Sequence, residues 1–265
     1  MQTPVALSIA GSDSSCGAGI QADLRTFSSL GVFGTTAITA LTAQNPARVT
    51  EVVGMDADFV TAQVQAVLEA FPVSGMKTGM LWSPEIISAV ASVLEANPDL
   101  PCVVDPVMIA TSGAKLVADE AIELYRTVLL PKAVLMTPNI DEAQVLLDGP
   151  SIDGSQQADA ARDLSERFGC AVLLKGGHLE GDPVDLLFED GEIYRWTNRR
   201  LDDVNTHGSG CTLSAAIAAY LAHGQPLKAA VEGGLNAVHH ALAHPVVPAP
   251  GLALAGLEDV RLQDR

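Results

Sequence analysis

Residues 206–212, Thr-His-Gly-Ser-Gly-Cys-Thr, carry the clearest chemical signal in the chain. Gly208 and Gly210 flank Ser209 at the expected start of an apolar helix. Backbone N–H groups around such closely spaced glycines can turn to one side and hold an anion at the positive end of the helix dipole. That arrangement would stabilise charge on a phosphoryl group in transfer. The same residues also allow a simple tight turn beside a free cysteine. A P-loop is excluded because the pattern GxxxxGK(S/T) is absent.

Cys211 follows the two glycines and falls in the first turn of that helix. The helix dipole and nearby N–H groups lower the pKa of a thiol in such a position from ~8.5 toward neutrality. We therefore predict that Cys211 acts as a base, or as a hydrogen-bond acceptor, for a substrate hydroxyl. His207, on the other side of the glycines, either touches a phosphate or satisfies the loop.

Oxygen-bearing side chains follow two other expected strands. Glu142 lies three residues after Asn139 at a strand-to-helix junction, and Asp105 ends a buried strand. Carboxylate and amide oxygens in this arrangement can hold Mg²⁺ through water, as phosphoryl-transfer sites do with few protein ligands. The same spacing makes a capping box, with Asn139 as the N-cap and Glu142 reaching back to it. Asp105 either shares the metal or caps the next loop.

Lys175 ends an apolar strand and precedes two glycines. A lysine in that place would direct its ammonium group into a cleft, toward phosphate. The alternative is an ordinary lysine that reaches solvent. Because the chain has only 15 lysine and arginine residues, a cation at a strand end favours the phosphate interpretation.

The elements that must position these residues alternate regularly between strand and helix. Apolar and β-branched runs predict strands, and apolar residues at helical spacing predict helices. This order indicates a three-layer αβα sandwich with a mostly parallel central sheet, in one domain over 1–265. Residues 32–40 and 49–53 are expected to form a small β flap on the main sheet, and the Pro- and Leu-rich tail from Pro245 to pack over the surface. The expected strands are 5–10, 35–42, 50–53, 73–77, 102–105, 133–136, 171–175, 184–188 and 192–196, and the expected helices are 20–30, 56–70, 84–96, 118–130, 140–147, 156–168, 208–222 and 226–244.

The composition limits the classes of partner. Net charge is −17, which argues against a nucleic-acid backbone or an anionic membrane as partner. Hydrophobic residues make up 48 % of the chain, which is enough for a large core. Four cysteines without a CxxC motif, and no signal peptide or membrane-length apolar run, indicate a reducing cytoplasm.

Seven ordered motifs together resemble one family. They are ALSIAGSDSSCGAGIQADLRTF, TALTAQN, KTGML, DPVM, TPNIDEAQVL, LLKGGH and NTHGSGCTLSAAIAA. In this order they resemble the ribokinase-like superfamily and, within it, the bacterial hydroxymethylpyrimidine/phosphomethylpyrimidine kinases of thiamine synthesis. The resemblance covers roughly residues 7–243.

The resemblance implies roles for individual residues. Residues 208–211 match the anion hole, with Cys211 at the catalytic position where many sugar kinases carry aspartate. Asn139 and Glu142 match the NxxE magnesium signature, and Lys175 matches the lysine near the phosphates of ATP. Six further residues match positions that the family uses for the pyrimidine: Gly11, Ala18, Asp23, Gln44, Met80 and Val107. Asp23 and Gln44 would read ring nitrogens and the exocyclic amine, while Met80 and Val107 would supply apolar walls.

Three residues depart from the family pattern. Cys16 stands where glycine is expected in the first loop, Ser209 replaces threonine between Gly208 and Gly210, and Pro46 replaces threonine after Gln44-Asn45. The Cys16 departure bears on the ring contacts but not on the reaction class.

By this resemblance the chain uses Mg²⁺ and ATP to phosphorylate 4-amino-5-hydroxymethyl-2-methylpyrimidine and then its monophosphate, and forms a homodimer. Three other functions stay open. A pyridoxal kinase would also accept a hydroxymethyl group on a flat heteroaromatic ring. A nucleotide-dependent dehydratase on the same fold would lack the Asp23 and Gln44 pair and usually carry an acid at position 211. A non-catalytic regulator would have lost Gly208 or Gly210.

Overall fold

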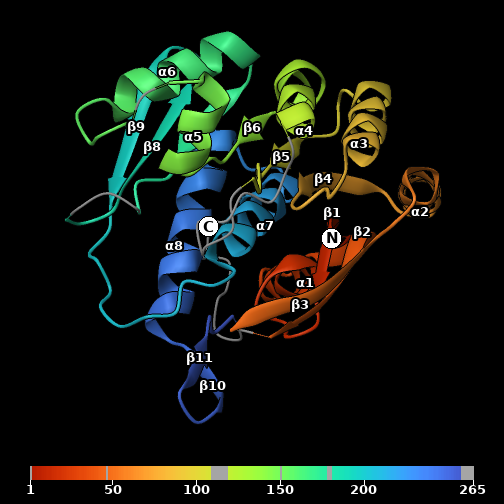
Figure 1. The fold of residues 1–265 in the computed structure, drawn as a ribbon, viewed down its shortest axis with the longest axis horizontal. Helices are drawn as coiled ribbons and strands as arrows, with labels where there is room; N and C mark the ends of the chain where they lie inside the picture. Colours follow the sequence, from red (N-terminus) through yellow and green to blue (C-terminus); the bar gives the residue numbers. More distant parts are fainter. Residues whose placement is uncertain (1, 46, 109–118, 150, 178–180, 258–265) are drawn as a thin grey trace.

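The computed structural model describes residues 2–45, 47–108, 119–149, 151–177 and 181–257. Within them, nine strands form a single sheet in the order β3-β2-β1-β4-β5-β6-β7-β8-β9 (Figure 1). The six strands from β2 to β7 in this order run parallel, and β3, β8 and β9 are antiparallel additions at the two edges. The strands are β1 (Val5–Asp13), β2 (Phe33–Asn45), β3 (Arg48–Gly54), β4 (Val73–Thr78), β5 (Cys102–Val104), β6 (Leu135–Met136), β7 (Ala171–Leu174), β8 (Val184–Glu189) and β9 (Glu192–Thr197).

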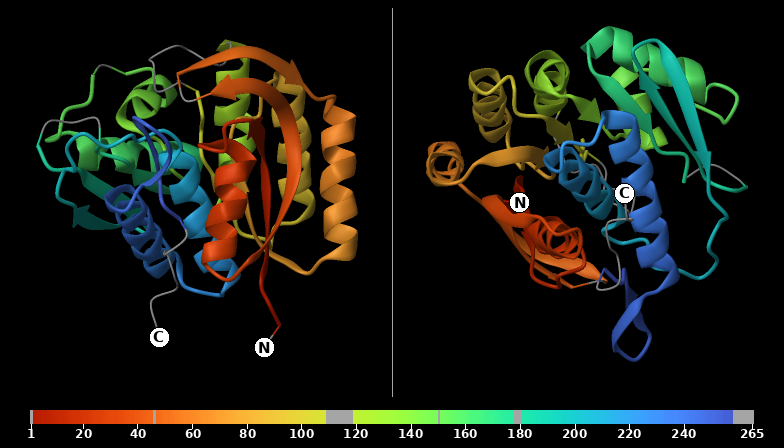
Figure 2. Two further views of the ribbon diagram at one scale, coloured as in Figure 1. Left: turned by 90° about the horizontal axis from the view of Figure 1, so that it is seen from below. Right: turned by 180° about the vertical axis from the view of Figure 1, so that it is seen from behind.

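Helices cover both faces of this sheet, which confirms the predicted three-layer architecture (Figures 1 and 2). On one face lie α1 (Gly19–Ser29), α7 (Ser209–Ala222) and α8 (Leu227–Ala243). The other face carries α2 (Ala57–Ala70), α3 (Pro84–Ala96), α4 (Asp119–Leu124), α5 (Ile140–Leu147) and α6 (Gln157–Phe168). Each face has its own hydrophobic core, built on alternate residues of the strands: Leu7 and Ile9 of β1 face one core, and Ala6 faces the other. No helix among the described residues is both long and apolar enough to cross a bilayer.

Most helix and strand boundaries follow from local signals in the sequence. Asp56 caps α2 through its side chain, and Ser83 with Pro84 starts α3. Asp190 and Gly191 both have positive φ in the two-residue turn between β8 and β9. The helix predicted over 118–130 is more broken: α4 gives way to a π-helical turn (Tyr125–Leu129) and a 3₁₀ turn (Leu130–Lys132), and residue 118 lies outside the described residues.

The tail and the flap add detail to the predicted fold. The tail forms a hairpin of β10 (Val246–Ala249) and β11 (Leu252–Leu254), which the sequence analysis did not predict. Pro250-Gly251 makes its turn, with Gly251 at φ +75°, and this Pro-Gly pair was the available signal. The predicted flap is an edge of the main sheet, because β2 pairs with β1 over most of its length and with β3 over its outer part.

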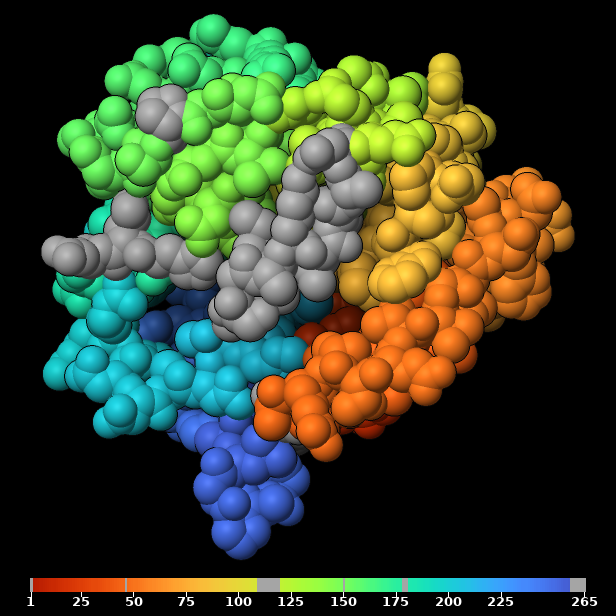
Figure 3. Space-filling view, in the orientation of Figure 1, coloured from red at the N-terminus to blue at the C-terminus, as the bar shows by residue number. Residues whose placement is uncertain are grey.

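Parallel strands bring their carboxyl ends to the same edge of the sheet. There the first loop, after β1, meets the residues that precede α7. Figure 3 shows the tip of β2 and β3, in orange, against the cyan segment that leads into α7. The sequence-predicted site residues therefore come together from both halves of the chain.

Candidate active site

The nest, residues 208–211, begins α7 and lies against the first loop. Gly208 is the N-cap at φ +79°, and an added Cβ there would lie 1.9 Å from the Gly17 carbonyl oxygen. Only glycine fits this close approach. Ser209 donates its N–H to the Thr206 carbonyl. The next N–H groups belong to the first helical turn and therefore have no intrahelical partner. The backbone is thus arranged as an anion site, and the serine in place of threonine changes only a side chain.

Lys175 lies beside the nest, at the end of β7. An added Cβ at Gly210 would lie 3.5 Å from Lys175 Nζ and 3.5 Å from Asp105 Oδ2. Lys175 Nζ lies 3.4 Å from Asp105 Oδ1, and 18 % of the lysine side chain is exposed. Burial would lower the pKa of Lys175, but the carboxylates of Asp105 and Glu142 raise it on balance. A charged ammonium next to the nest, on a side chain that is not fully buried, is suited to a phosphate.

Asp105 joins this lysine to the base of the nest. Its Oδ1 also accepts a hydrogen bond from Thr137, 3.3 Å away, and its Oδ2 accepts one from Ser214 of α7, 3.4 Å away. The carboxylate is nearly buried, at 3 % exposure. Its contacts connect the ends of β5 and β6 with α7 beside Lys175.

Asn139 and Glu142 form the capping box that the spacing also allowed. Asn139 Oδ1 accepts the Glu142 N–H at 2.8 Å, and Glu142 Oε2 accepts the Asn139 N–H at 2.9 Å. Glu142 Oε1 accepts the Met108 N–H at 3.4 Å. Burial raises the pKa of Glu142 to about 7, with Lys175 lowering it and Asp105 raising it.

The carboxylates of Asp105 and Glu142 fit a magnesium ion chemically. Both are hard oxygen donors on either side of Lys175, and Mg²⁺ commonly takes one or two carboxylates with the rest of its shell from water and phosphate. A buried carboxylate with a raised pKa would be stabilised in its ionised form by a divalent cation. In the described part of the chain, no cluster of three or more His, Cys, Asp or Glu forms a complete protein cage for a metal.

Cys211 has a different character from the one predicted. The Gly19 N–H, at the start of α1, is close enough to lower the pKa of the Cys211 thiol, which itself stands at the start of α7. Burial nevertheless raises the pKa of Cys211 to about 11, although the ammonium of Lys77 and the Gly19 N–H lower it. The expected shift toward neutrality is therefore wrong. At this position desolvation of the thiolate outweighs the favourable dipoles.

A second lysine–aspartate pair is sealed inside the protein. Lys77 Nζ, on β4, lies 3.1 and 3.2 Å from the two carboxylate oxygens of Asp23 on α1, and both side chains have no exposed surface. Ser8 of β1 donates a further hydrogen bond to Asp23. Contact between Asp23 and a pyrimidine ring stays a prediction, and in this conformation its carboxylate has no surface that a ring could reach.

The other predicted ring residues lie around the first loop. Gly11 and Met80 touch, because an added Cβ at Gly11 would lie 2.6 Å from Met80 Cε. Ala18 donates its N–H to Asp13 in the same loop, at 2.9 Å. Gln44, at the tip of β2, and Val107, after β5, are each half-buried. Of these residues, Ala18 lies against Gly208 of the nest and Gln44 contacts the neighbouring His207.

Two departures from the family pattern differ in what the structure says. Cys16 is exposed and has φ +62°, a conformation that favours glycine. That backbone geometry explains why glycine is expected there. Pro46 lies outside the described residues.

Sequence reasoning missed three contributors: Lys77, Asp13 and the part played by His207. Lys77 stands in an otherwise apolar strand, and a lysine there signals a buried partner. Asp13 accepts hydrogen bonds from Ser15 and Ala18 and lies 3.2 Å from His207 Nε2. An aspartate followed by serine and glycine residues was the available sign of a loop organised by a carboxylate.

Comparisons with known proteins identify the family. The phosphomethylpyrimidine kinase family model matches residues 13–252. A hydroxymethylpyrimidine/phosphomethylpyrimidine kinase of Rhizobium meliloti is 46 % identical over 244 residues, which are 91 % of each chain. The thiamine biosynthesis bifunctional protein ThiED of Geobacter sulfurreducens is also 46 % identical, and the chain spans about half of its length (46 %).

Solved structures give the same result for the fold. The phosphomethylpyrimidine kinase of Clostridium difficile has a TM-score of 0.80 at 38 % identity, covering 89 % of this chain and 98 % of that one. An ADP complex of a Bacillus subtilis pyridoxal kinase has a TM-score of 0.90 at 31 % identity, covering 97 % and 98 %. The similarity of fold does not distinguish pyrimidine kinases from pyridoxal kinases. The sequence identities, however, are higher with the pyrimidine kinases. The chain belongs to the phosphomethylpyrimidine kinase family.

Proposed function

We propose that the chain transfers the γ-phosphoryl group of ATP to the hydroxymethyl group of 4-amino-5-hydroxymethyl-2-methylpyrimidine, and then phosphorylates the monophosphate to the diphosphate in thiamine biosynthesis. The observation that carries this proposal is the ammonium of Lys175 beside Gly210 of the nest, on a side chain that is 18 % exposed. In the first step a bond forms between the hydroxymethyl oxygen and the γ-phosphorus, the bond to the bridging oxygen breaks, and ADP leaves.

Each residue near the nest has a distinct task in this proposal. The N–H groups of Gly210 and Cys211 in the nest hold the moving phosphoryl group, and Lys175 neutralises the triphosphate. Magnesium, held through Asp105 and Glu142, would supply further positive charge to the phosphates. Asn139 keeps Glu142 in place through the capping box.

Cys211 acts mainly as a hydrogen-bonding group for the substrate hydroxyl. With a pKa of about 11 its thiol is protonated at neutral pH. Phosphoryl transfer through a loose transition state needs little base assistance, because bond formation to the hydroxyl has barely begun. The fit between an uncharged thiol and this chemistry supports the proposal.

On the ring side, Gln44 pairs with the pyrimidine while Gly11, Ala18, Met80 and Val107 enclose it. Asp23 on α1 contributes to this side through its ion pair with Lys77. We further propose that residues 1–265 work as one domain, as a homodimer, and in the cytoplasm.

A coupled assay of ADP release tests the function directly. The pyrimidine, its monophosphate and pyridoxal are compared at equal ATP and magnesium. We expect turnover of both pyrimidines, with a kcat/KM above that for pyridoxal. A higher kcat/KM for pyridoxal would overturn the proposal in favour of the pyridoxal kinases that share this shape with TM-scores of 0.87 and above.

A further inference from the structure

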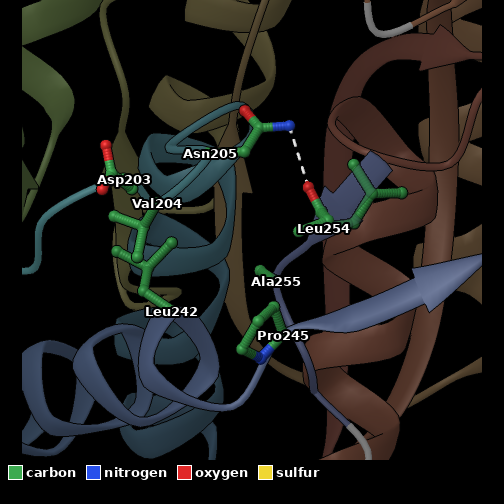
Figure 4. A pocket seen from close by; sticks show the side chains of 8 residues that line it. Asp203, Val204, Asn205, Leu242, Pro245, Leu254 and Ala255 are labelled. Atoms are coloured by element: carbon green, nitrogen blue, oxygen red, sulfur yellow. Dashed lines mark hydrogen bonds between the residues drawn. The ribbon is translucent and has the colours of Figure 1, made fainter. Parts of the chain in front are cut away.

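His207 joins the first loop to the tip of β2. Its Nε2 lies 3.2 Å from Asp13 Oδ2 and 3.4 Å from Gln44 Nε2. Its main chain is also fixed, because its N–H donates to Asn205 Oδ1 at 3.0 Å. Asn205 Nδ2 donates in turn to the Ala253 carbonyl at 2.9 Å, which ties this segment to the C-terminal hairpin (Figure 4). His207 is therefore held through Nε2 of its ring and through its backbone N–H.

Asp13 determines which partner is the donor in its hydrogen bond with the His207 imidazole. Its carboxylate is 3 % exposed and accepts hydrogen bonds from Ser15 N–H, Ser15 Oγ and Ala18 N–H, at 2.8, 2.7 and 2.9 Å. Burial alone would raise the pKa of Asp13, but the hydrogen bonds from His207, Ser15 and Ala18 lower it. An ionised carboxylate only accepts, so His207 Nε2 must carry its hydrogen toward Asp13, whether the ring is neutral or charged.

That assignment creates a conflict at Gln44. A nitrogen that donates to Asp13 cannot also accept from the Gln44 amide nitrogen, so two donors would face each other. A half-turn of the amide removes the conflict, because Oε1 then faces the single Nε2 hydrogen and shares it with Asp13 Oδ2. The amide nitrogen then faces Thr42 Oγ1, which already donates its hydrogen to the Ser12 carbonyl at 2.8 Å and keeps lone pairs free to accept.

We infer that His207 is a positioning residue that fixes the amide orientation of Gln44 and thereby determines which hydrogen-bonding group Gln44 offers to the substrate ring. This inference rests on the proposed function, in which Gln44 contacts the pyrimidine. It assigns the ring specificity partly to a residue next to the nest. The ring site and the phosphoryl site are thus joined through two consecutive residues, His207 and Gly208.

A double-mutant cycle on steady-state kinetics tests the inference. His207→Ala should raise the KM for the pyrimidine about five- to tenfold, since one hydrogen bond of ordinary strength is lost. The KM for ATP should change little. Gln44→Ala should raise the pyrimidine KM at least as much, and the double variant should be no worse than Gln44→Ala alone. His207→Gln, which keeps an N–H donor, should recover most of the loss, and His244→Ala, an exposed histidine on the last helix, is the matched control.

The outcomes separate the inference from the proposed function. Effects of His207→Ala and Gln44→Ala that multiply in the double variant would overturn the inference, as would an unchanged pyrimidine KM in His207→Ala. Equal increases in the KM for ATP and the KM for the pyrimidine that His207→Gln does not reverse would also overturn it. Such increases would mean that His207 acts on the nest alone. If Gln44→Ala itself leaves the pyrimidine KM unchanged, the proposed ring site is wrong, and the inference fails with it.

Discussion

Two lysine–aspartate pairs stand at the carboxyl edge of the same sheet, and they differ in exposure. Lys77 and Asp23 are sealed, with no exposed side-chain surface and N–O distances of 3.1 and 3.2 Å. Lys175 and Asp105 are more loosely joined at 3.4 Å, and the lysine side chain is 18 % exposed. A sealed pair has no capacity left for a ligand, whereas an open pair keeps donors free. The same two residue types therefore serve stability in one place and, in the proposed function, phosphate binding in the other.

The largest effect should come from breaking the sealed pair. Lys77→Met leaves the Asp23 carboxylate buried without its cation, and losing one member of a buried pair costs about 3–5 kcal/mol. Urea unfolding measures this loss. Lys132→Met, which removes a partly exposed ion pair with Glu95, is the matched control and should cost less than about 1 kcal/mol. Similar losses in the two variants would show that burial does not distinguish the pairs.

Breaking the open pair should instead reduce activity. Lys175→Met removes the cation beside the nest, and loss of one preorganised electrostatic contact typically lowers kcat by about 10²–10³-fold. Its free energy of unfolding should fall by less than that of Lys77→Met, because Asp105 keeps hydrogen bonds from Thr137 and Ser214. Kinetics and unfolding of the same preparations check both points. A variant that unfolds but keeps its kcat would reverse the assignment.

The hydrogen bond from Ser8 sharpens the account of the sealed pair. Ser8→Ala removes one donor to the buried carboxylate of Asp23, and hydrogen bonds to charged groups contribute about 1.5–3 kcal/mol. Ser88→Ala, on the exposed side of α3, provides the control. We expect reduced stability in Ser8→Ala with an almost unchanged KM for ATP. A stability equal to that of the control would mean that Lys77 alone satisfies Asp23.

Charges from both pairs act on the pKa of Cys211: Lys77 lowers it, and Asp23 and Asp105 raise it. Because its pKa is raised to about 11, the thiolate is scarce at pH 8 and its fraction should rise about tenfold per pH unit up to pH 10. Alkylation by iodoacetamide, followed at each site by mass spectrometry, measures this slope, with exposed Cys16 as the internal reference. A rate that is already constant above pH 7 would show that the helix dipoles and Lys77 dominate.

The sequence predicted most of the fold because its signals are local. Apolar runs ending in glycine or polar residues mark the parallel strands, and capping residues such as Asp56 and Ser83 mark the helices. The π-helical turn after α4 and the hairpin of β10 and β11 were not predicted. Both depend on how short segments pack against the rest of the protein, which periodicity does not reveal.

The candidate site was predictable only in part, and the two lysines show why. Each ends a buried strand, so local sequence cannot tell a lysine that faces a ligand from one that faces a partner. The partner of Lys77 lies 54 positions away on α1. Glu142 presents the same problem, because a capping box and a metal ligand share one spacing. For Cys211 the helix start was identified correctly, but the burial that raises its pKa comes from tertiary packing.

The contact between His207 and Asp13 has a consequence for how the chain is made. These residues are 194 positions apart, yet the nest needs the first loop beside it. During synthesis β1 pairs early with β2 and β4, while α7, which packs on β4, emerges only after about three-quarters of the chain. Until then one apolar face of the central strands is uncovered, and closing such distant contacts is slow. A nascent chain that stalls before residue 207 would contain all nine strands of the main sheet but neither His207 nor the glycines of the nest.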